Sequence, residues 1–356
     1  ASLSILLHSI IVDPYVWILG RFITGFSIIS IFVVVESWLN DRATNRTRGK
    51  VLSIYMIITF VGIGLGTLLL NFNNPKNYEP FILVSLLLSI ALVPILLTKR
   101  KPPTFKKTSR IKIKELYKIS PLATFSMFCV GFIHPAIFTM GAVYGALMNF
   151  SVLEISLYLF LITLSGAIFQ WPIGFLSDRF DRRIILIITA LFGSIFTVLC
   201  FFSVSISPDF INLSSDWKTI LQHISNHRLL FYIFISLYAG MSLPLFSLNL
   251  AYVNDFLPKE KFVSAGAGMQ IIFGISAMTA PFVCSFFMKN FGPNGIFIFL
   301  FIFQTLIGVF GIYRMTRRST EENPNNTFTP MPRNITPLGM ELDPDTGVDL
   351  NKENKN

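Results

Sequence analysis

Nine apolar runs, each long enough to cross a lipid bilayer, dominate the sequence. They cover about residues 16–36, 51–71, 80–97, 120–147, 156–176, 184–204, 229–252, 263–287 and 294–314. A helix of about 20 apolar residues matches the hydrocarbon thickness of a bilayer and satisfies its own backbone groups there. The chain is 53% hydrophobic and only 13% charged, whereas soluble domains carry about 25% charged residues. The sequence therefore predicts an all-α polytopic membrane protein.

Basic residues are distributed unequally between alternate loops. The loops on one side hold 21 Lys and Arg, and those on the other side hold four. Because short cytoplasmic loops carry the excess of positive charge, this asymmetry predicts that the basic side and the C-terminus are cytoplasmic. It also explains the net charge of +10 without a nucleic-acid partner. We expect a multi-pass membrane protein that contacts membrane lipids.

One loop on the basic side carries the most specific motif, Gly174-Phe-Leu-Ser-Asp178-Arg179-Phe-Asp181-Arg182-Arg183. Its pattern, Gly-x-Leu-x-Asp-Arg-x-x-Arg-Arg, resembles the loop signature of the major facilitator superfamily of secondary transporters. The resemblance implies a latch between helices that is made and broken as the transporter changes its open side. Gly174 would allow close helix approach, and Asp178 would accept hydrogen bonds from a helix N-terminus or pair with the arginines. The family often has glycine at Asp181, and the alternative interpretation is an ordinary basic loop.

A weak internal repeat links the two ends of the sequence. Gly25 leads after 15 residues to Asn40-Asp41, and Gly240 leads after 14 residues to Asn254-Asp255. Parallel repeats of six helices each are the architecture of this superfamily. The repeat therefore predicts two pseudo-symmetric helical bundles, and we expect Asp41 and Asp255 to take part in the latch.

The family resemblance extends over residues 1–318. The run Arg21–Gly25 is similar to an Arg-x-x-x-Gly element of family helix 4, and Glu36–Arg42 and Ala251–Asp255 resemble a bacterial branch, the YcaD-like transporters. The register makes residues 1–12 the end of helix 3, so helices 1 and 2 would precede residue 1. A truncated product and a ten-helix relic both fit. We favour truncation, because half a hydrophobic helix at residue 1 would leave a free end in the bilayer.

Four regions follow from this register. They are residues 1–97, the remainder of the N-terminal bundle; 98–119, a basic cytoplasmic linker; 120–318, a C-terminal six-helix bundle; and 319–356, a polar tail rich in Asn and Pro. Segments of such composition cannot bury enough apolar surface to become ordered. We therefore expect a disordered cytoplasmic tail.

Three ionisable side chains within apolar runs are candidates for coupling transport to protons. A charge such as Arg21 inside a span costs about 3 kcal/mol unless it faces a cavity or a partner, and the matching arginine of the family faces the interior. Glu36 could carry the coupling proton, and its alternative is an interfacial pair with Arg42 or Arg46. His134 can bind solute or relay a proton, and its alternative is a hydrogen bond between helices.

Neutral polar side chains are further candidates for solute binding. The run 229–252, which the repeat makes equivalent to helix 10, carries polar side chains that recur at helical spacing. Helices 4, 7 and 10 line the cavity in this family. The bland alternative is packing between helices. Pro172, Pro244 and Pro281 are expected to bend their helices. The solute-binding candidates are Tyr238, Ser242, Asn249, Gln170 and Gln270.

The sequence shows no arrangement typical of an enzyme. It has no phosphate-binding loop of the Gly-x-x-x-x-Gly-Lys-Ser/Thr type, no zinc-ligand spacing, and no basic soluble domain for nucleic acid. Cys129, Cys200 and Cys284 lie in apolar runs and are expected to be buried thiols. The family resemblance implies a monomeric secondary active transporter of the bacterial inner membrane, without cofactors or metal, that moves a small solute by alternating access, with proton coupling as a hypothesis. The alternative is a non-transporting scaffold or sensor, or an inactive truncated remnant.

Overall fold

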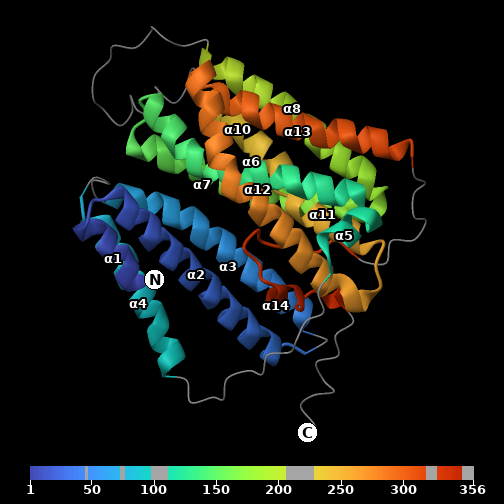
Figure 1. The fold of residues 1–356 in the computed structure, drawn as a ribbon, viewed down its shortest axis with the longest axis horizontal. Coiled ribbons are helices and arrows are strands. Elements are labelled where there is room, and N and C mark those ends of the chain that lie inside the picture. The colour runs from blue at the N-terminus through green and yellow to red at the C-terminus, as the bar shows by residue number, and fades with distance from the viewer. Residues whose placement is uncertain (45–46, 73–76, 98–110, 206–227, 318–326, 347–356) are drawn as a thin grey trace.

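The computed structural model describes residues 1–44, 47–72, 77–97, 111–205, 228–317 and 327–346. Within these residues the chain folds into helices joined by short connections, without β-strands. Figure 1 shows two groups of helices. The first group is built from the N-terminal part of the chain, and the second runs from α5 to α13. The all-α architecture predicted from the apolar runs is confirmed.

The first group contains four α-helices. They are α1 (Ser2–Ile10), α2 (Pro14–Arg42), α3 (Arg48–Leu68), which continues as a 3₁₀ turn over Leu69–Phe72, and α4 (Glu79–Leu96). The Asp13 carboxylate accepts hydrogen bonds from the backbone N–H groups of Tyr15 (2.9 Å) and Val16 (3.0 Å). Pro14 follows at the first helical position, where its missing N–H costs nothing. The sequence Asp-Pro thereby fixes the start of α2.

The second group forms a larger bundle. Its helices are α5 (Ile113–Ile119), α6 (Pro121–Leu147), α7 (Val152–Arg179), α8 (Arg182–Ser205), α10 (Leu229–Ser242), α11 (Leu245–Asn254), α12 (Phe262–Phe291) and α13 (Gly295–Met315). A capping box starts α7, because the Ser151 hydroxyl accepts from the Glu154 N–H while the Glu154 carboxylate accepts from the Ser151 N–H. The predicted linker overlaps α5, and its residues 98–110 lie outside the described ranges.

Two helices of the second bundle approach each other closely at a glycine. A Cβ atom on Gly131 of α6 would lie 2.0 Å from the Ser276 Oγ and 2.5 Å from the Phe273 backbone oxygen of α12. Small residues allow such backbone contact between helices in a membrane, where dispersion contacts replace the hydrophobic effect as the driving force. The backbones of α6 and α12 are therefore in close contact at Gly131.

The run 229–252, predicted as one span, is divided into α10 and α11 at Pro244. Proline has no backbone N–H, and its ring clashes with the carbonyl group four residues earlier. Pro172 and Pro281 instead lie inside the continuous helices α7 and α12. The predicted polar stripe thus crosses a helix break, with Ser242 before it and Asn249 after it.

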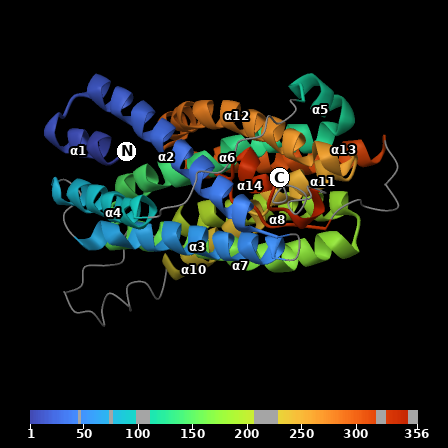
Figure 2. The same ribbon diagram turned by 90° about the horizontal axis from the view of Figure 1, so that it is seen from below.

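The two groups of helices meet through α3 and α7 (Figures 1 and 2). A Cβ atom on Gly64 would lie 3.2 Å from the ring of Phe160. At the end of this contact the Asn71 side-chain amide donates a hydrogen bond to the Ser156 hydroxyl (2.6 Å). Most of the apolar surface of α2 and α3 is not buried by this contact.

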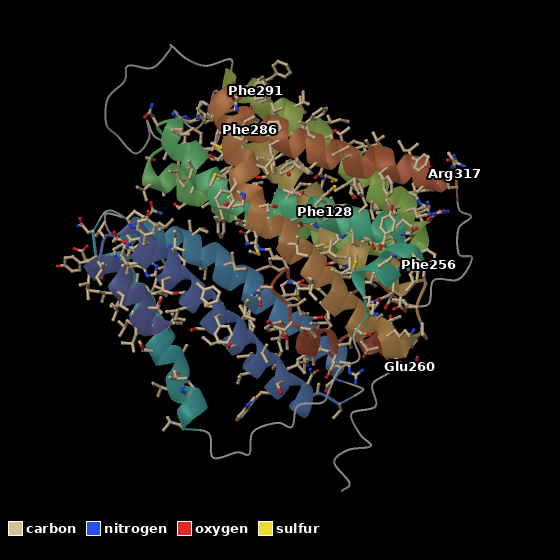
Figure 3. The ribbon with its side chains drawn as sticks, viewed as in Figure 1. Phe128, Phe256, Glu260, Phe286, Phe291 and Arg317 are labelled. Carbon is tan, nitrogen blue, oxygen red and sulfur yellow. The ribbon has the colours of Figure 1, made fainter. Side chains whose placement is uncertain are left out.

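Eight helical segments are long and apolar enough to cross a membrane, and α4 contributes a shorter apolar stretch over Glu79–Pro94, counting only described residues. Large apolar side chains point outward from the bundle, as expected for surfaces in contact with lipid. Phe286 and Phe291 at one end of α12 are 62% and 57% exposed (Figure 3). The predicted multi-pass membrane protein is confirmed.

The C-terminal tail differs from the disorder that its composition predicts. Residues 327–346 fold into an irregular segment with the short helix α14 (Pro337–Met340) and a 3₁₀ turn over Pro344–Thr346. Met331, Ile335 and Met340 of this segment are at most 5% exposed. The physical reason for the difference is that these apolar side chains are covered by the two bundles, a contribution that composition alone does not reveal.

Candidate functional site

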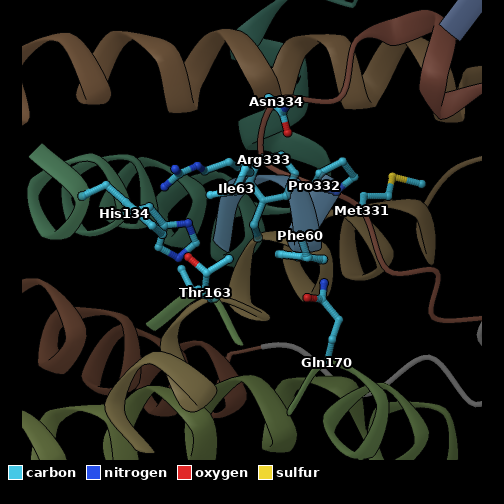
Figure 4. A pocket seen from close by; sticks show the side chains of 12 residues that line it. Phe60, Ile63, His134, Thr163, Gln170, Met331, Pro332, Arg333 and Asn334 are labelled. Atoms are coloured by element: carbon cyan, nitrogen blue, oxygen red, sulfur yellow. The ribbon is translucent and has the colours of Figure 1, made fainter. Parts of the chain in front are cut away.

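A small cavity lies between the two bundles, and α3, α6, α7 and α11 contribute to its wall (Figure 4). With the tail in place its volume is about 30 Å³, which is room for water only. Aromatic and apolar groups make up most of the wall, and a few polar groups converge on it. The lining residues are Phe60, Ile63, His134, Phe138, Thr163, Gln170, Leu243 and Phe246 from the helices and Met331, Pro332, Arg333 and Asn334 from the tail.

His134 is one of the polar groups of this wall and is only 1% exposed. Its Nε2 lies 3.0 Å from the backbone oxygen of Ser242. A carbonyl oxygen only accepts, so Nε2 carries the proton and Nδ1 is left as the acceptor. Nδ1 has no hydrogen-bond partner in the described part of the chain. The ring is thus held by the break between α10 and α11, with one acceptor available to a ligand.

Gln170 of α7 faces the same cavity. Its Nε2 donates to the Ser247 hydroxyl (2.7 Å), while its Oε1 is buried without a partner among the described residues. A buried amide oxygen that lacks a partner costs free energy, so its presence points to an occupant that can donate a hydrogen bond. Ser247 lies on α11 and was not singled out from the sequence, because serine in an apolar helix carries no motif.

The tail supplies the cation of the site. The Arg333 guanidinium carbon lies 3.7 Å from the centre of the Phe138 ring on α6, a geometry in which the ring quadrupole attracts the charge. Burial lowers the pKa of Arg333 to about 10, so the side chain remains charged at neutral pH. Figure 4 shows it beside His134 in the cavity.

Glu36 lies outside this cavity, against the tail. It is 0% exposed, and its carboxylate accepts hydrogen bonds from the Tyr55 hydroxyl (2.7 Å), the Thr336 N–H (2.9 Å), the Thr336 hydroxyl and the Gly339 N–H (3.1 Å). Four donors therefore solvate the carboxylate in place of water. The alternative pairing with Arg42 or Arg46 involves side chains that the structure does not describe.

The remaining candidates occupy different places. Arg21 is exposed on α2 rather than directed into the cavity. Gln270 of α12 donates through Nε2 to the Arg333 backbone oxygen (2.8 Å). Tyr238, Ser242 and Asn249 are fully or almost fully buried inside the second bundle and do not line the cavity. The structure thus brings His134 and Gln170 together at one cavity. Gln270 contacts the tail from α12, and Arg21 lies apart from both.

The loop between α7 and α8 is organised by Arg182. Its guanidinium group bonds the Asp178 carboxylate (2.8 Å) at the end of α7 and the Asp255 carboxylate (2.5 Å) that follows α11. Arg182 and Asp255 are both nearly buried, with side chains 3% and 6% exposed. This pairing joins the ends of three helices in one bundle.

The neighbouring charges of the loop have local partners. Arg183 contacts both carboxylate oxygens of Asp181, the residue that departs from the family pattern. Arg179 lies over the Phe175 ring at 4.0 Å. Next to them, a Cβ atom on Gly174 would lie 2.2 Å from the ring of Phe328. The close approach that was predicted for Gly174 is therefore to the tail. Asp41 is the next-to-last residue of α2, and its side chain lies outside the described part of the structure.

A profile of the Major Facilitator Superfamily matches residues 1–220, which is more than half of the chain. The chain belongs to this superfamily. Among similar proteins, the uncharacterized MFS-type transporter YcaD of Escherichia fergusonii is 22% identical over 289 residues, covering 80% of this chain and 68% of the relative. An uncharacterized MFS-type transporter of Yersinia enterocolitica is 24% identical over 291 residues, covering 81% and 70%. No solved structure matches the chain.

This membership supports a membrane transporter rather than an enzyme. No group of three His, Cys, Asp or Glu side chains that could hold a metal occurs among the described residues. The three cysteines are buried, as the sequence predicts. The family resemblance and its YcaD-like branch are therefore confirmed.

We expect the tail to hold its place more tightly at acidic pH. Burial raises the pKa of Asp343 to about 6, while Arg48 of α3 lowers it and Asp345 in the tail raises it. A carboxyl group whose pKa is higher in the docked state stabilises that state as the pH falls. The pKa of Asp343 is about 6 in the docked tail and 3.8 for an ordinary aspartate. The equilibrium constant for docking should therefore rise about tenfold between pH 7 and pH 5.

Hydrogen exchange of the backbone amides in residues 327–346, corrected for the intrinsic pH dependence, measures this change. Asp343→Asn, which resembles the protonated form, should make the protection almost independent of pH. The same pH dependence in the wild type and in the asparagine variant would contradict the assignment to Asp343.

Proposed function

We propose that the chain is a secondary active transporter that moves a small solute by alternating access, with its solute site in the cavity between the bundles. The observation that carries this proposal is the convergence of His134 and Gln170 from two helices on one cavity. Superfamily membership supports transport in general. In this proposal, the loop between α7 and α8 faces the cytoplasm and its Asp–Arg contacts change with the open side.

The chemistry of the wall favours a solute with both an apolar body and hydrogen-bonding groups. Phe60, Phe138 and Phe246 offer ring surfaces, while His134 Nδ1 and Gln170 Oε1 are acceptors without partners in the described structure. Such a wall accepts donors such as hydroxyl, amine or guanidinium groups. Proton coupling through Glu36 or His134 is part of the proposal, since both side chains are buried and can gain or lose a proton as their surroundings change.

A solute panel in proteoliposomes tests the proposal. Sugars, amino acids and amphipathic amines are added separately outside the vesicles, and their uptake is followed with and without an imposed pH gradient. We expect one class to be transported and Gln170→Leu to weaken its apparent affinity about tenfold, through loss of one buried hydrogen-bonding group. Gln304→Leu on α13 is the matched control, because Gln304 is 0% exposed but does not line the cavity.

Three results would count against parts of the proposal. Absence of transport for every class in the full chain would remove the transport function. An equal effect of the two glutamine substitutions would remove the cavity as the solute site. Transport at the same rate with and without the pH gradient would remove proton coupling.

A further inference from the structure

The folded tail segment, residues 327–346, lies between the two bundles. Figures 1 and 2 show α14 beside α2, and α14 packs against both α2 and α12. These two helices belong to different bundles. The segment therefore contacts both walls of the region in which the proposed solute site is located.

The contacts with the first bundle are made by polar groups near the end of α2. Glu36 accepts three hydrogen bonds from the tail, two from Thr336 and one from Gly339. The Asn40 amide donates to the backbone oxygen of Leu338, and Arg48 at the start of α3 donates to the Thr346 hydroxyl (3.2 Å). Buried side chains of the bundle thus satisfy backbone groups of the tail, which is how a peptide is recognised.

The contacts with the second bundle follow the same principle. The Ser247 hydroxyl donates to the Met331 backbone oxygen (3.1 Å) and lies 3.0 Å from the Met331 N–H. Gln270 donates to the Arg333 backbone oxygen (2.8 Å), and Asp178 accepts from the Phe328 N–H (2.7 Å). Each bundle therefore contributes several hydrogen bonds to the backbone of the same segment.

The tail and the bundles also fit closely in shape. A Cβ atom on Gly266 of α12 would lie 2.2 Å from the Met340 sulfur. In the tail itself, a Cβ atom on Gly339 would lie 2.5 Å from the Glu36 carboxyl carbon and 2.7 Å from its Oε2. A larger residue at position 339 would therefore clash with a carboxylate that four hydrogen bonds hold in place.

The sequence of the segment suits binding in one conformation. Pro330, Pro332 and Pro337 fix their own backbone torsions and favour extended conformations before them. A segment restrained in this way loses less entropy on docking. Its residues Met331–Asn334 fill the cavity so far that about 30 Å³ remains.

We propose that the region between the bundles is a binding site for residues 327–346 of the chain's own tail, and that the docked tail keeps solute out of the cavity until it leaves. The part concerning solute rests on the proposed transport function. The peptide-binding part does not, because it follows from the contacts of Glu36, Asn40, Ser247 and Gln270 with the tail backbone.

Cysteine labelling of the full chain in lipid nanodiscs tests the proposal without any solute. Thr163→Cys reports on the cavity, since the Thr163 hydroxyl bonds only its own helix. Met331→Cys reports on the tail, because Met331 contacts Ser247 through its backbone. Lys259→Cys, at an exposed site, gives the reference rate. The probe is a charged, water-soluble maleimide, and the buried native cysteines provide an unreactive background.

We expect both reporters to react at least about tenfold more slowly than the Lys259→Cys reference, since reaction requires the tail to leave. Adding Gly339→Val should raise both rates to within about threefold of the reference. Gly274→Val is the matched control, because a Cβ atom there meets nothing within 4 Å. It should leave both reporters protected.

Three outcomes would overturn the proposal. Fast reaction of Met331→Cys in the otherwise unchanged chain would show that the tail is not docked. Slow reaction of Met331→Cys in the Gly339→Val chain would show that the contact of Gly339 with Glu36 does not hold the tail in place. Fast reaction of Met331→Cys with continued protection of Thr163→Cys in that chain would show that the tail does not cover the cavity. Failure of the solute panel would instead remove the transport function and leave the labelling result in place.

Discussion

Arg182→Gln is expected to lower the free energy of unfolding by about 3–5 kcal/mol, the cost of removing one partner from a buried ion pair. The Arg182 and Asp255 side chains are 3% and 6% exposed, so glutamine would leave the Asp255 carboxylate without its cation in a poorly solvated place. The Ala251 backbone oxygen, which accepts from Arg182 at 3.2 Å, would lose a charged donor as well. Unfolding in mixed micelles, followed by tryptophan fluorescence, measures the change.

Arg183→Gln is the matched control, because Arg183 pairs with Asp181 only two residues away in the same turn. Asp181 is 16% exposed, so its carboxylate stays closer to water than that of Asp255, and the loss should be smaller, about 2 kcal/mol, the value of a hydrogen bond between charged groups. The double variant Arg182→Gln with Asp255→Asn should regain at least half of the stability lost in the single variant, since no carboxylate is then left buried beside position 182. Equal losses of stability for Arg182→Gln and Arg183→Gln would show that the ion pair of Arg182 with Asp255 does not contribute more than the local pair of Arg183.

Gly131→Leu should abolish folding of the second bundle. The Cβ atom would lie 2.5 Å from the Phe273 backbone oxygen, and a backbone atom cannot move aside as a side chain can. The helices α6 and α12 would have to move apart, although both also pack against α13. We expect a loss of more than about 3 kcal/mol, at the upper end of overpacking effects.

Fluorescence-detected size-exclusion chromatography of a tagged chain measures this loss as the disappearance of the monodisperse peak. Gly274→Leu is the control on α12, since no atom lies within 4 Å of its Cβ position. A monodisperse peak of normal height for Gly131→Leu would mean that α6 and α12 are farther apart than the structure places them.

Hydropathy predicted the membrane helices well because this signal is local. A long apolar run has few alternatives to a membrane helix, and Asp13-Pro14 marks a helix start by its own chemistry. The division of the run 229–252 at Pro244 was harder to predict. Pro172 and Pro281 lie in continuous helices, so the presence of proline does not decide between a bend and a break.

The site was only partly predictable. His134 and Gln170 were singled out as polar residues in apolar helices, and they do face one cavity. The environment of Glu36 could not be predicted, because its partners Thr336 and Gly339 lie 300 residues or more away in the chain. Arg333 was missed because a basic residue in a polar tail normally indicates only solvation. Long-range contacts of this kind leave no periodic signal.

The two asparagines that the predicted repeat makes equivalent, Asn40 and Asn254, both lie next to the tail. Asn40 lies two residues before the end of α2 and Asn254 ends α11, and each is 6% exposed. Asn40 bonds the tail backbone, while Asn254 lines a small cavity beside Met340 and Thr346. The tail therefore lies between the two helix ends that carry these asparagines.

The tail is joined to the end of α13 at Met315 by a short stretch of chain, and this attachment changes how tightly it has to bind. A segment tethered so closely is present at a local concentration on the order of 1 mM. A detached peptide with a Kd of about 0.1 mM would thus, once tethered, occupy its site about nine-tenths of the time. Scission anywhere between Met315 and Thr327 would dilute the segment into bulk solvent and leave the space between the bundles empty at ordinary protein concentrations.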